Sequence, residues 1–359
     1  MLRDFEAEAR QKLDPAAYDY FAGGALDERA MRANCAAFQR VKLHHRVLRA
    51  ATNPVTPVTL LGLELSMPVL VAPMAFQGMA HPNGEEATAR ACADAGIGLA
   101  VSTTSNCPTA NVATAAKGAL WQQLYMMKDR AITTALVRIA EASGCKAIFL
   151  TADVPAWGRR ERDMRNGFAL PAGLVIGSLL IPERRDFYDG SFPSDLGTFI
   201  NDRLKFDLTW DDVAWLRSIT KLPIILKGIS HPEDARLAVE HDVAAVAVSN
   251  HGGRQLDAAP ATIEALPDIV DAIDGRIPII LDGGIRRGTD VVAALALGAQ
   301  AVTIGRPVLW GLAAAGQQGV RQVLETLRAE IKNTMTLCGC TSVADLTRDI
   351  VELPRQARI

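Results

Sequence analysis

The feature that most constrains the fold is a repeat of short apolar runs separated by longer amphipathic stretches, between about residue 68 and residue 310. The runs are rich in Val, Ile, Leu and Ala, which is typical of strands buried on both faces of a parallel sheet. Eight such strands alternating with helices predict a closed (β/α)8 barrel, the TIM barrel. The runs cover residues 68–75, 97–103, 119–125, 146–154, 223–229, 244–250, 278–284 and 301–306.

The stretches between the runs have the composition of helices. The segment Ser230-His-Pro-Glu233 predicts a capping box with a proline in the first helical turn. The main alternative fold, a doubly wound open sheet, carries a Gly-x-Gly-x-x-Gly turn after its first strand. That turn is missing from the sequence, and Gly96-Ile-Gly98 opens a strand instead. The predicted helices cover residues 85–95, 129–143, 211–220, 231–241 and 289–297.

The length of 359 residues fits one barrel with additions, so we expect a single domain over residues 1–359. Residues 1–67 predict a helical N-terminal extension with a hairpin near 55–65, residues 68–310 the barrel core, and residues 311–359 C-terminal helices. The insertion at 171–208 follows the fourth strand and has the length of a lid. Its apolar part, 173–181, is too short to span a membrane, and we interpret it as the cover of a pocket.

Charge and cysteine content argue against several classes of function. The formal net charge is −2, without the basic excess of a nucleic-acid-binding protein. No two of the six cysteines form a Cys-x-x-Cys pair and none lies near a histidine, so we expect no metal site. Scattered cysteines of this kind, a charged first segment and the absence of a membrane-length apolar run predict a cytoplasmic protein without membrane attachment.

Polar residues recur where the predicted strands end. Because the carboxyl ends of barrel strands form the active sites of TIM barrels, we expect these side chains to converge. Lys227 lies among apolar residues, where an unpaired ammonium is costly to bury. We interpret it as a fixed cation that faces an anionic cofactor or substrate, and the alternative is a strand-end lysine that reaches solvent. The other strand-end residues are Ser102, Gln123, Tyr125, Thr151, Asp153, Ser249, Asp282 and Arg306, with Arg160 just beyond the fourth strand.

Two local motifs carry the chemistry. Asp282-Gly-Gly-Ile-Arg286 and Gly305-Arg306 follow the seventh and eighth strands, the usual phosphate site of such barrels. Ser249-Asn-His-Gly-Gly-Arg-Gln-Leu-Asp257 places His251 and Arg254 close together after the sixth strand. A histidine can accept a proton near neutral pH, and an arginine can hold a carboxylate by two parallel hydrogen bonds.

Together these motifs resemble those of the FMN-dependent 2-hydroxy acid oxidases and dehydrogenases. The resemblance extends from Tyr18-Asp-Tyr20 to the helix after Pro307, and it implies a barrel with FMN as cofactor. It also implies oxidation of an (S)-2-hydroxy acid of the lactate, glycolate or mandelate type, with oxygen reduced to hydrogen peroxide. The motifs are APMAF, QLYMMKDR, LTADVPAWGRRERDMRN, LKGI, SNHGGRQLD, LDGGIRRGTD and IGRP.

The resemblance further implies roles for individual residues. His251 corresponds to the catalytic base, Asp153 to the carboxylate that stabilises its protonated form, and Tyr125 to the tyrosine that binds the substrate hydroxyl. The residues implied to bind the substrate carboxylate are Tyr20, Arg160 and Arg254. The residues implied to bind FMN are Ala75, Ser102, Gln123, Thr151 and Ser249 at the ring or ribityl chain, Lys227 at the N1–C2 edge, and Asp282, Gly284, Arg286, Gly305 and Arg306 at the ribityl tail and phosphate.

Two positions depart from the glycolate-oxidising members of the family. Thr104 stands where they carry a tryptophan, and Trp157 stands where they carry a leucine. This redistribution of bulk argues against glycolate as the best substrate and leaves lactate and aromatic acids such as mandelate open.

Three other functions stay open at this point. A dehydrogenase would pass the electrons to a quinone or another carrier. An FMN-dependent isomerase would not need two arginines for a carboxylate, and a non-catalytic flavin-binding protein would not need the complete set of site residues. We expect no nucleic-acid or membrane partner, and a homotetramer or larger homo-oligomer.

Overall fold

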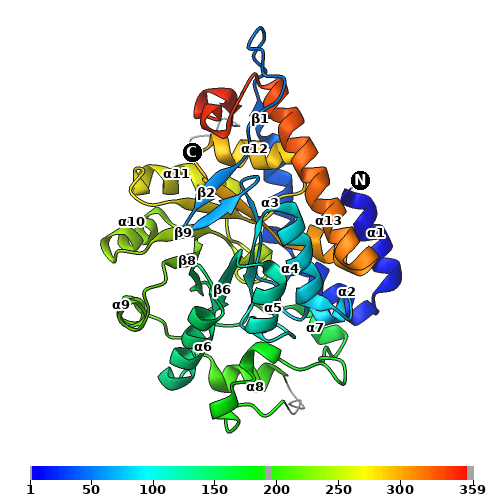
Figure 1. Cartoon of the computed structure of the whole chain (residues 1–359), viewed down its shortest axis with the longest axis vertical. Helices are drawn as coiled ribbons and strands as arrows, with labels where there is room; N and C mark the ends of the chain where they lie inside the picture. Colours follow the sequence, from blue (N-terminus) through cyan, green and yellow to red (C-terminus); the bar gives the residue numbers. More distant parts are fainter. Residues whose placement is uncertain (1, 191–195, 354–359) are drawn as a thin grey trace.

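The computed structural model describes residues 2–190 and 196–353, and it contains a closed barrel of eight strands (Figure 1). All neighbouring strands of the barrel pair in parallel. Each predicted run contains one strand, so the predicted fold class is confirmed. The strands are β4 (Val69–Val71), β5 (Gly98–Val101), β6 (Leu120–Leu124), β7 (Ile148–Thr151), β8 (Ile224–Ile229), β9 (Ala245–Val248), β10 (Ile279–Asp282) and β11 (Ala301–Ile304).

The interior of the barrel is a packed core. One apolar cluster takes a buried residue from every strand, with Trp121 and Phe149 as its largest side chains. Leucines of a hairpin, β2 (Val58–Leu60) and β3 (Leu63–Leu65), belong to the same cluster and close one end of the barrel. Since the hairpin lies at the start of β5, where Leu63 meets Gly98, it closes the N-terminal end and leaves the C-terminal end for the site.

The barrel strands are connected by helices, and the predicted helices are present within one residue at each end. The predicted capping box is wrong in one respect: His231, not Ser230, is the N-cap of α10. The Nδ1 atom of His231 accepts a hydrogen bond from the Glu233 N–H at 3.2 Å, the function that a serine oxygen usually has. The helices are α4 (Gly84–Ala95), α5 (Thr109–Ala116), α6 (Arg130–Ala142), α9 (Trp210–Ile219), α10 (Pro232–Glu240), α11 (Thr262–Ile273), α12 (Gly288–Ala296) and α13 (Arg306–Leu337).

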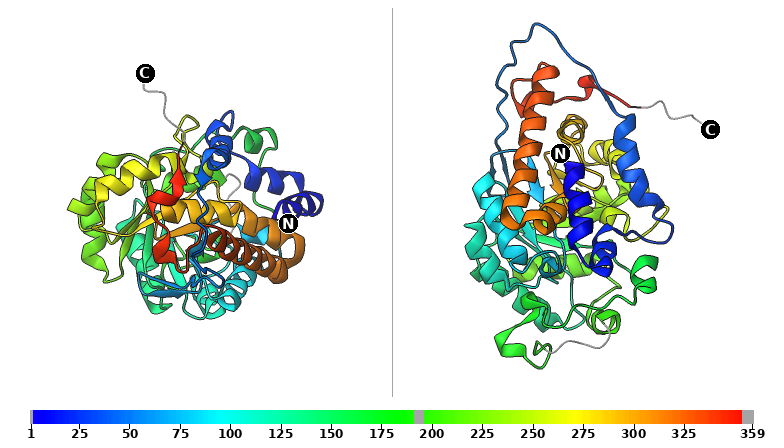
Figure 2. Two further views of the ribbon diagram at one scale, coloured as in Figure 1. Left: turned by 90° about the horizontal axis from the view of Figure 1, so that it is seen from above. Right: turned by 90° about the vertical axis from the view of Figure 1, so that its right-hand side faces the viewer.

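Segments from both ends of the chain pack beside one another outside the barrel (Figure 2). The N-terminal extension forms α1 (Leu2–Lys12), α2 (Pro15–Ala22) and α3 (Arg29–Arg40), and α1 packs on α13. The expected C-terminal helices are present as far as Leu337, where α13 ends after a kink at Ala315 and Gly316, and only the region beyond Leu337 differs. After α13 come the 3-10 turns η5 (Val343–Asp345) and η6 (Arg348–Ile350) and a short strand, β12 (Val351–Glu352), which pairs with β1 (Lys42–Leu43). This pairing satisfies backbone groups that a further helix would have satisfied internally.

The insertion after the fourth strand is anchored more firmly than a simple cover would be. It contains η2 (Gly177–Leu179), η3 (Pro182–Arg184) and α8 (Leu196–Arg203), and its residues 191–195 lie outside the described part of the chain. The apolar run 173–181 does not line the pocket, which corrects its interpretation as a pocket cover. It packs on loops after β4 and β5, where the Ser178 hydroxyl donates to the Thr103 carbonyl. Ile200 and Leu204, in and just after α8, line the pocket instead.

No helix within residues 2–190 and 196–353 combines the length and apolar character that a membrane crossing requires. The same residues contain no group of three or more His, Cys, Asp or Glu side chains arranged to hold a metal ion. All six cysteines are free thiols.

Replacing the interior residue Trp121 by alanine tests the packing of the barrel. Its ring is fully buried edge-to-face on Phe149, 6.0 Å between centroids. We expect Trp121→Ala to lower the free energy of unfolding by about 3–5 kcal/mol, because it leaves a cavity between rigid strands. Urea unfolding measures this, and Leu256→Ala, at a 69% exposed position, is the control. A loss below about 1 kcal/mol would show that the interior closes around the gap.

Candidate active site

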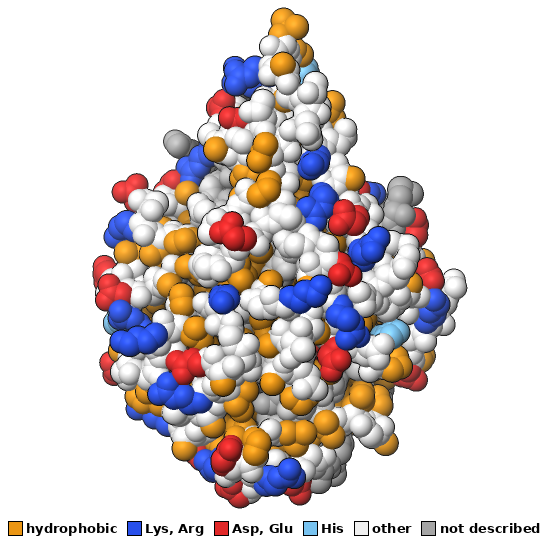
Figure 3. All heavy atoms as spheres, in the orientation of Figure 1, with side chains coloured by type: hydrophobic (Ala, Val, Ile, Leu, Met, Phe, Trp, Pro, Cys, Tyr) orange, Lys and Arg blue, Asp and Glu red, His pale blue; other side chains and the backbone are white. Residues whose placement is uncertain are grey.

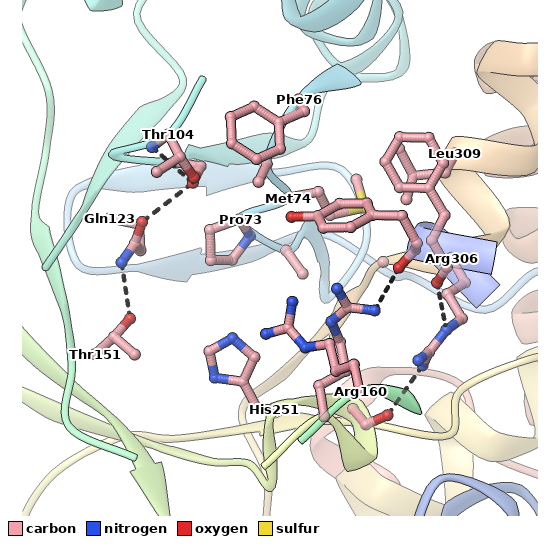
Figure 4. A pocket seen from close by; sticks show the side chains of 18 of the residues that line it. Pro73, Met74, Phe76, Thr104, Gln123, Thr151, Arg160, His251, Arg306 and Leu309 are labelled. Atoms are coloured by element: carbon pink, nitrogen blue, oxygen red, sulfur yellow. Dashed lines mark hydrogen bonds between the residues drawn. The ribbon is translucent and has the colours of Figure 1, made fainter. Parts of the chain in front are cut away.

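One cavity lies at the carboxyl ends of the barrel strands, where the predicted polar residues converge (Figure 4). Its volume of about 490 Å³ is within the range of sites that hold a cofactor or a small ligand. All predicted site residues line it except Asp153 and Ser249, which lie directly behind it. The predicted residues that line the cavity are Tyr20, Ala75, Ser102, Gln123, Tyr125, Thr151, Arg160, Lys227, His251, Arg254, Asp282, Gly284, Arg286, Gly305 and Arg306.

His251 presents a neutral imidazole to this cavity. Its φ of 58° lies in the left-handed region that non-glycine residues rarely adopt, and its N–H donates to the Ser249 hydroxyl at 3.1 Å. The Nδ1 atom lies 2.9 Å from an Asp153 oxygen, while Nε2 lies 3.5 Å from the Tyr125 hydroxyl. Burial lowers the pKa of His251 despite the opposing effect of Asp153, so its ring is free to accept a proton at pH 7.

A buried ammonium lies beneath the histidine. Lys227 is 4% exposed, and its Nζ donates to the Ser249 hydroxyl at 3.0 Å. It also lies 3.6 Å from Asp153 and 3.8 Å from Asp282, which accepts a 2.7 Å hydrogen bond from the same serine. Burial alone would raise the pKa of Asp153, but the positive charge of Lys227 and then the interaction with the His251 ring outweigh it and hold that pKa at about 2. Asp153 therefore stays ionised.

The contact between Asp153 and Lys227 depends on a glycine. The pairing of β8 with β9 shifts between Lys227 and Ile229, so the strand bulges at Gly228. Gly228 has a φ of 108°, and a Cβ there would lie 2.4 Å from the Cβ of Asp153. Only glycine allows this close approach.

Two partly buried arginines form a candidate anion site. Arg254 donates from one nitrogen to the carbonyl oxygens of Tyr20 at 2.6 Å and Gly23 at 2.9 Å. Arg160 lies 3.9 Å from Asp163, and its Nε has no hydrogen-bond partner among the described residues. Burial and then the charge of Arg160 lower the pKa of Arg254 to about 10, because two cations share one desolvated space. A carboxylate would relieve this repulsion and bind to both.

The other end of the cavity is also positively charged. The turn after β10 carries Gly283 and Gly284 with φ of 103° and 84°, so backbone groups can approach a ligand closely there. Arg306 donates to the backbone carbonyls of Phe21, Gly252 and Gly23, and it forms no ion pair with a described residue. Burial, then Arg254 and Arg286, lower the pKa of Arg306 to about 9. Glycine turns and unpaired arginines at a barrel rim are features of a phosphate site.

Hydrogen-bonding side chains lie between the two charged ends. Gln123 donates from its amide nitrogen to the Thr151 hydroxyl at 2.9 Å (Figure 4). Its amide oxygen accepts from the Thr103 N–H at 2.8 Å. Ser102 approaches the same oxygen at 3.4 Å. These contacts fix the orientation of the Gln123 amide, so the cavity wall carries a preorganised polar strip.

Sequence reasoning missed part of the cavity wall. Phe168 stacks on Tyr20, 4.4 Å between ring centroids, and nothing near it in the sequence distinguishes it from an ordinary packed loop residue. Trp157, which the sequence did single out, stands edge-on to Tyr125 at 6.4 Å. The other lining residues that were missed are mostly apolar, among them Pro73, Met74, Phe76, Met164, Ile200, Leu204, Ile304 and Leu309.

The fold and the site together define a barrel enzyme that binds a phosphate-bearing group at one end of its cavity and a carboxylate at the other. Comparison with known families is more specific. The chain belongs to the FMN-dependent dehydrogenase family, whose model matches residues 9–353. Its cofactor is FMN, and the resemblance noted from the sequence motifs is confirmed.

The chain is similar to characterised relatives over almost its whole length. It is 47% identical to the glycolate oxidase of Spinacia oleracea, over 97% of this chain and 94% of the relative. It is 46% identical to the L-lactate oxidase of a Nostoc species, over 98% of both chains. The solved structure of a mandelate oxidase with (S)-4-hydroxymandelic acid matches with a TM-score of 0.91 at 43% identity, over 98% of both chains.

Replacing Asp153 by asparagine tests the electrostatics of the histidine. We expect Asp153→Asn to lower the pKa of His251 below its wild-type value, because the Asp153 carboxylate is the group that raises it against burial. NMR titration of the protein labelled with ¹³C in its histidine rings measures this pKa. Asp163→Asn is the matched control, since Asp163 pairs with Arg160. An unchanged or raised pKa in Asp153→Asn would remove Asp153 from this role.

Proposed function

We propose that the protein oxidises an (S)-2-hydroxy acid to the 2-oxo acid with bound FMN, and that oxygen is the final electron acceptor and yields hydrogen peroxide. The observation that carries this proposal is the pair of facing arginines, Arg160 and Arg254, in the cavity that His251 also lines. A carboxylate held by both cations brings the adjacent carbon and its hydroxyl to a proton acceptor. Tyr20, whose ring lies 4.9 Å from the Arg254 guanidinium, adds a third contact to the carboxylate side.

Tyr125 and His251 would bind the reacting hydroxyl between them. Burial raises the pKa of Tyr125, so its hydroxyl stays protonated and donates to the substrate oxygen. The neutral His251 then accepts a proton at Nε2, either from the substrate hydroxyl or from the substrate α-carbon. The ionised Asp153, 2.9 Å from Nδ1, stabilises the imidazolium that results. The chain thus offers a donor, an acceptor and a compensating charge at one place.

The rest of the cavity fits FMN. The observation that supports this fit is the donor set: unpaired arginines beside two glycines of positive φ at one end, and a fixed amide with hydroxyls in the middle. When bound, FMN supplies the two-electron oxidation. Lys227, a buried cation, would stabilise negative charge on the bound FMN. We assign Ala75, Ser102, Gln123, Thr151, Lys227 and Ser249 to the ring and ribityl chain, and Asp282, Gly284, Arg286, Gly305 and Arg306 to the ribityl tail and phosphate.

Oxygen is favoured as the electron acceptor because the similar proteins named above are oxidases. A dehydrogenase that passes electrons to a quinone or another carrier is the second candidate, which the dehydrogenase name of the family favours. Isomerisation is less well supported, because it does not require two arginines that bind a carboxylate. The side chain of the acid would lie near Thr104, Trp157 and Phe168, which line the cavity.

We also propose that the protein is a homotetramer or larger homo-oligomer in the cytoplasm. The segment between β1 and β2 projects from the body and carries apolar atoms at its tip (Figures 2 and 3). Val47 on this segment is 70% exposed and Leu48 is fully exposed, which favours contact with another copy of the chain. Six free thiols fit a reducing compartment. A monomeric mass in solution would contradict the oligomeric part of the proposal.

Anaerobic titration of the FMN-loaded protein with (S)-2-hydroxy acids tests the reaction. We expect lactate, glycolate or mandelate to bleach the flavin absorbance, because the arginine pair and His251 recognise the hydroxy acid group itself. Admission of oxygen should restore the absorbance and release hydrogen peroxide. If no acid of the panel bleaches the flavin absorbance, the proposed function is wrong. Bleaching followed by recovery only with a quinone would instead establish the dehydrogenase.

Replacing His251 by alanine tests the base. We expect His251→Ala to retain FMN but to lose about 10²- to 10⁴-fold in turnover, the usual contribution of a general base. In the wild type, kcat/KM should fall as the pH drops below 6.5 through the lowered pKa of His251, and this acid limb should disappear in the variant. His241→Ala is the control, because His241 stacks on Trp210 outside the cavity. Wild-type turnover in His251→Ala would assign the base to another residue.

A further inference from the structure

We infer that Asn34, a residue of the N-terminal extension, is a positioning residue of this site that ties the turn bearing His251 to the phosphate-binding turn. Asn34 lies on α3, outside the barrel, and does not line the cavity. It is nonetheless 2% exposed, although asparagine is seldom buried to this degree. The expected effect of Asn34 on turnover rests on the proposed function, whereas its expected effect on the affinity for FMN rests only on FMN binding.

Asn34 forms a reciprocal amide pair with Asn250, the residue before His251. The Asn34 nitrogen donates to the Asn250 oxygen at 2.8 Å, and the Asn250 nitrogen donates to the Asn34 oxygen at 2.8 Å. The Asn34 oxygen also accepts from the Thr262 N–H at 3.3 Å, and the Asn250 nitrogen also donates to the Pro260 carbonyl at 3.0 Å. Each amide is therefore held by several partners in one orientation.

The orientation of Asn250 matters for His251. The Asn250 side-chain oxygen accepts from the Gly253 N–H at 3.1 Å and so caps the short turn η4 (His251–Gly253). The left-handed φ of His251 is a conformation that persists only where the surroundings over-determine it. Without the Asn34 amide, the Asn250 side chain loses a donor and an acceptor and can rotate away from this cap.

Asn34 also lies against the phosphate-binding turn. A Cβ added to Gly284 would lie 2.3 Å from the Asn34 carbonyl oxygen, and one added to Gly283 would lie 3.2 Å from its side-chain nitrogen. Asn34 thus lies against the turn after β10 with its carbonyl oxygen and its side-chain nitrogen, and it binds the turn after β9 with its side-chain amide. A single residue from outside the barrel sets the spacing of the two turns.

Removal of the Asn34 side chain should not detach α3. The Ala30 N–H near the start of the helix donates to Asp257 at 3.1 Å, and Arg40 at its last residue pairs with Glu264. Asn34→Ala therefore removes the amide pair while both ends of the helix stay anchored. Arg40→Ala is the matched control, because it weakens the attachment of the same helix without touching Asn250.

The test compares Asn34→Ala, Asn250→Ala, the double variant and Arg40→Ala. We expect each single asparagine variant to lower kcat by about tenfold or more, since small misplacements of reacting groups are costly. The kcat of the double variant should lie within about threefold of the kcat of the less active single variant, because the two amides act as one unit. Fluorescence titration of the apoprotein should show a Kd for FMN that is raised severalfold in Asn34→Ala. Arg40→Ala should match the wild type in both measurements.

The inference is overturned if Asn34→Ala only lowers the melting temperature and leaves kcat and the Kd for FMN unchanged. It is also overturned if the loss of kcat in the double variant equals the product of the losses in Asn34→Ala and Asn250→Ala. Asn34→Asp repeats the test with a side chain of equal size that accepts the same hydrogen bonds but cannot donate to Asn250, and it decides the question if Asn34→Ala does not fold. If the wild type oxidises no hydroxy acid, the proposed function fails, whereas the Kd for FMN still tests the contact of Asn34 with the phosphate turn.

Discussion

The burial of one ammonium group is the constraint on which the site depends. Lys227 cannot be buried among apolar strands without compensation, and two carboxylates, Asp153 and Asp282, supply it within 4 Å. One positive and two negative charges leave one negative charge in excess, which favours a proton on His251. Burial opposes that proton and prevails in the free protein, because the pKa of His251 is lowered. Burial therefore keeps His251 neutral at rest, while the Asp153 carboxylate of the cluster stabilises its protonated form.

Much of the fold and of the site could be predicted from the sequence because both follow from local patterns. A buried parallel strand is an apolar run, and the residue at its carboxyl end lies at the rim of the barrel, so eight runs place Gln123, Lys227, His251 and Asp282 in one ring. The sequence motifs then distinguish the phosphate end from the carboxylate end. These inferences require only the order of residues along each strand.

What the sequence could not predict depends on contacts between distant segments. The N-terminal extension covers the His251 turn: the Ala25 N–H donates to the Gly253 carbonyl at 2.9 Å, and Arg162 pairs with Glu28 at 2.6 Å. A single asparagine at position 34 has no pattern that marks it as part of a site on another segment. The same is true of β12, which forms only because β1 offers it a partner, and of the His231 cap, where an imidazole replaces the expected serine.

The two ends of the cavity obtain their affinity for anions in the same way. Arg254 and Arg306 are anchored by backbone carbonyls instead of carboxylates, so their orientation is fixed while their charge stays available. The carbonyls belong partly to the N-terminal extension, at Phe21 and Gly23 for Arg306. Burial and then neighbouring cations lower the pKa of each arginine, as expected where like charges share a site without an anion. A phosphate at one end and a carboxylate at the other would relieve this repulsion, and since Arg254 and Arg306 also act on each other, each anion changes the field in which the other binds.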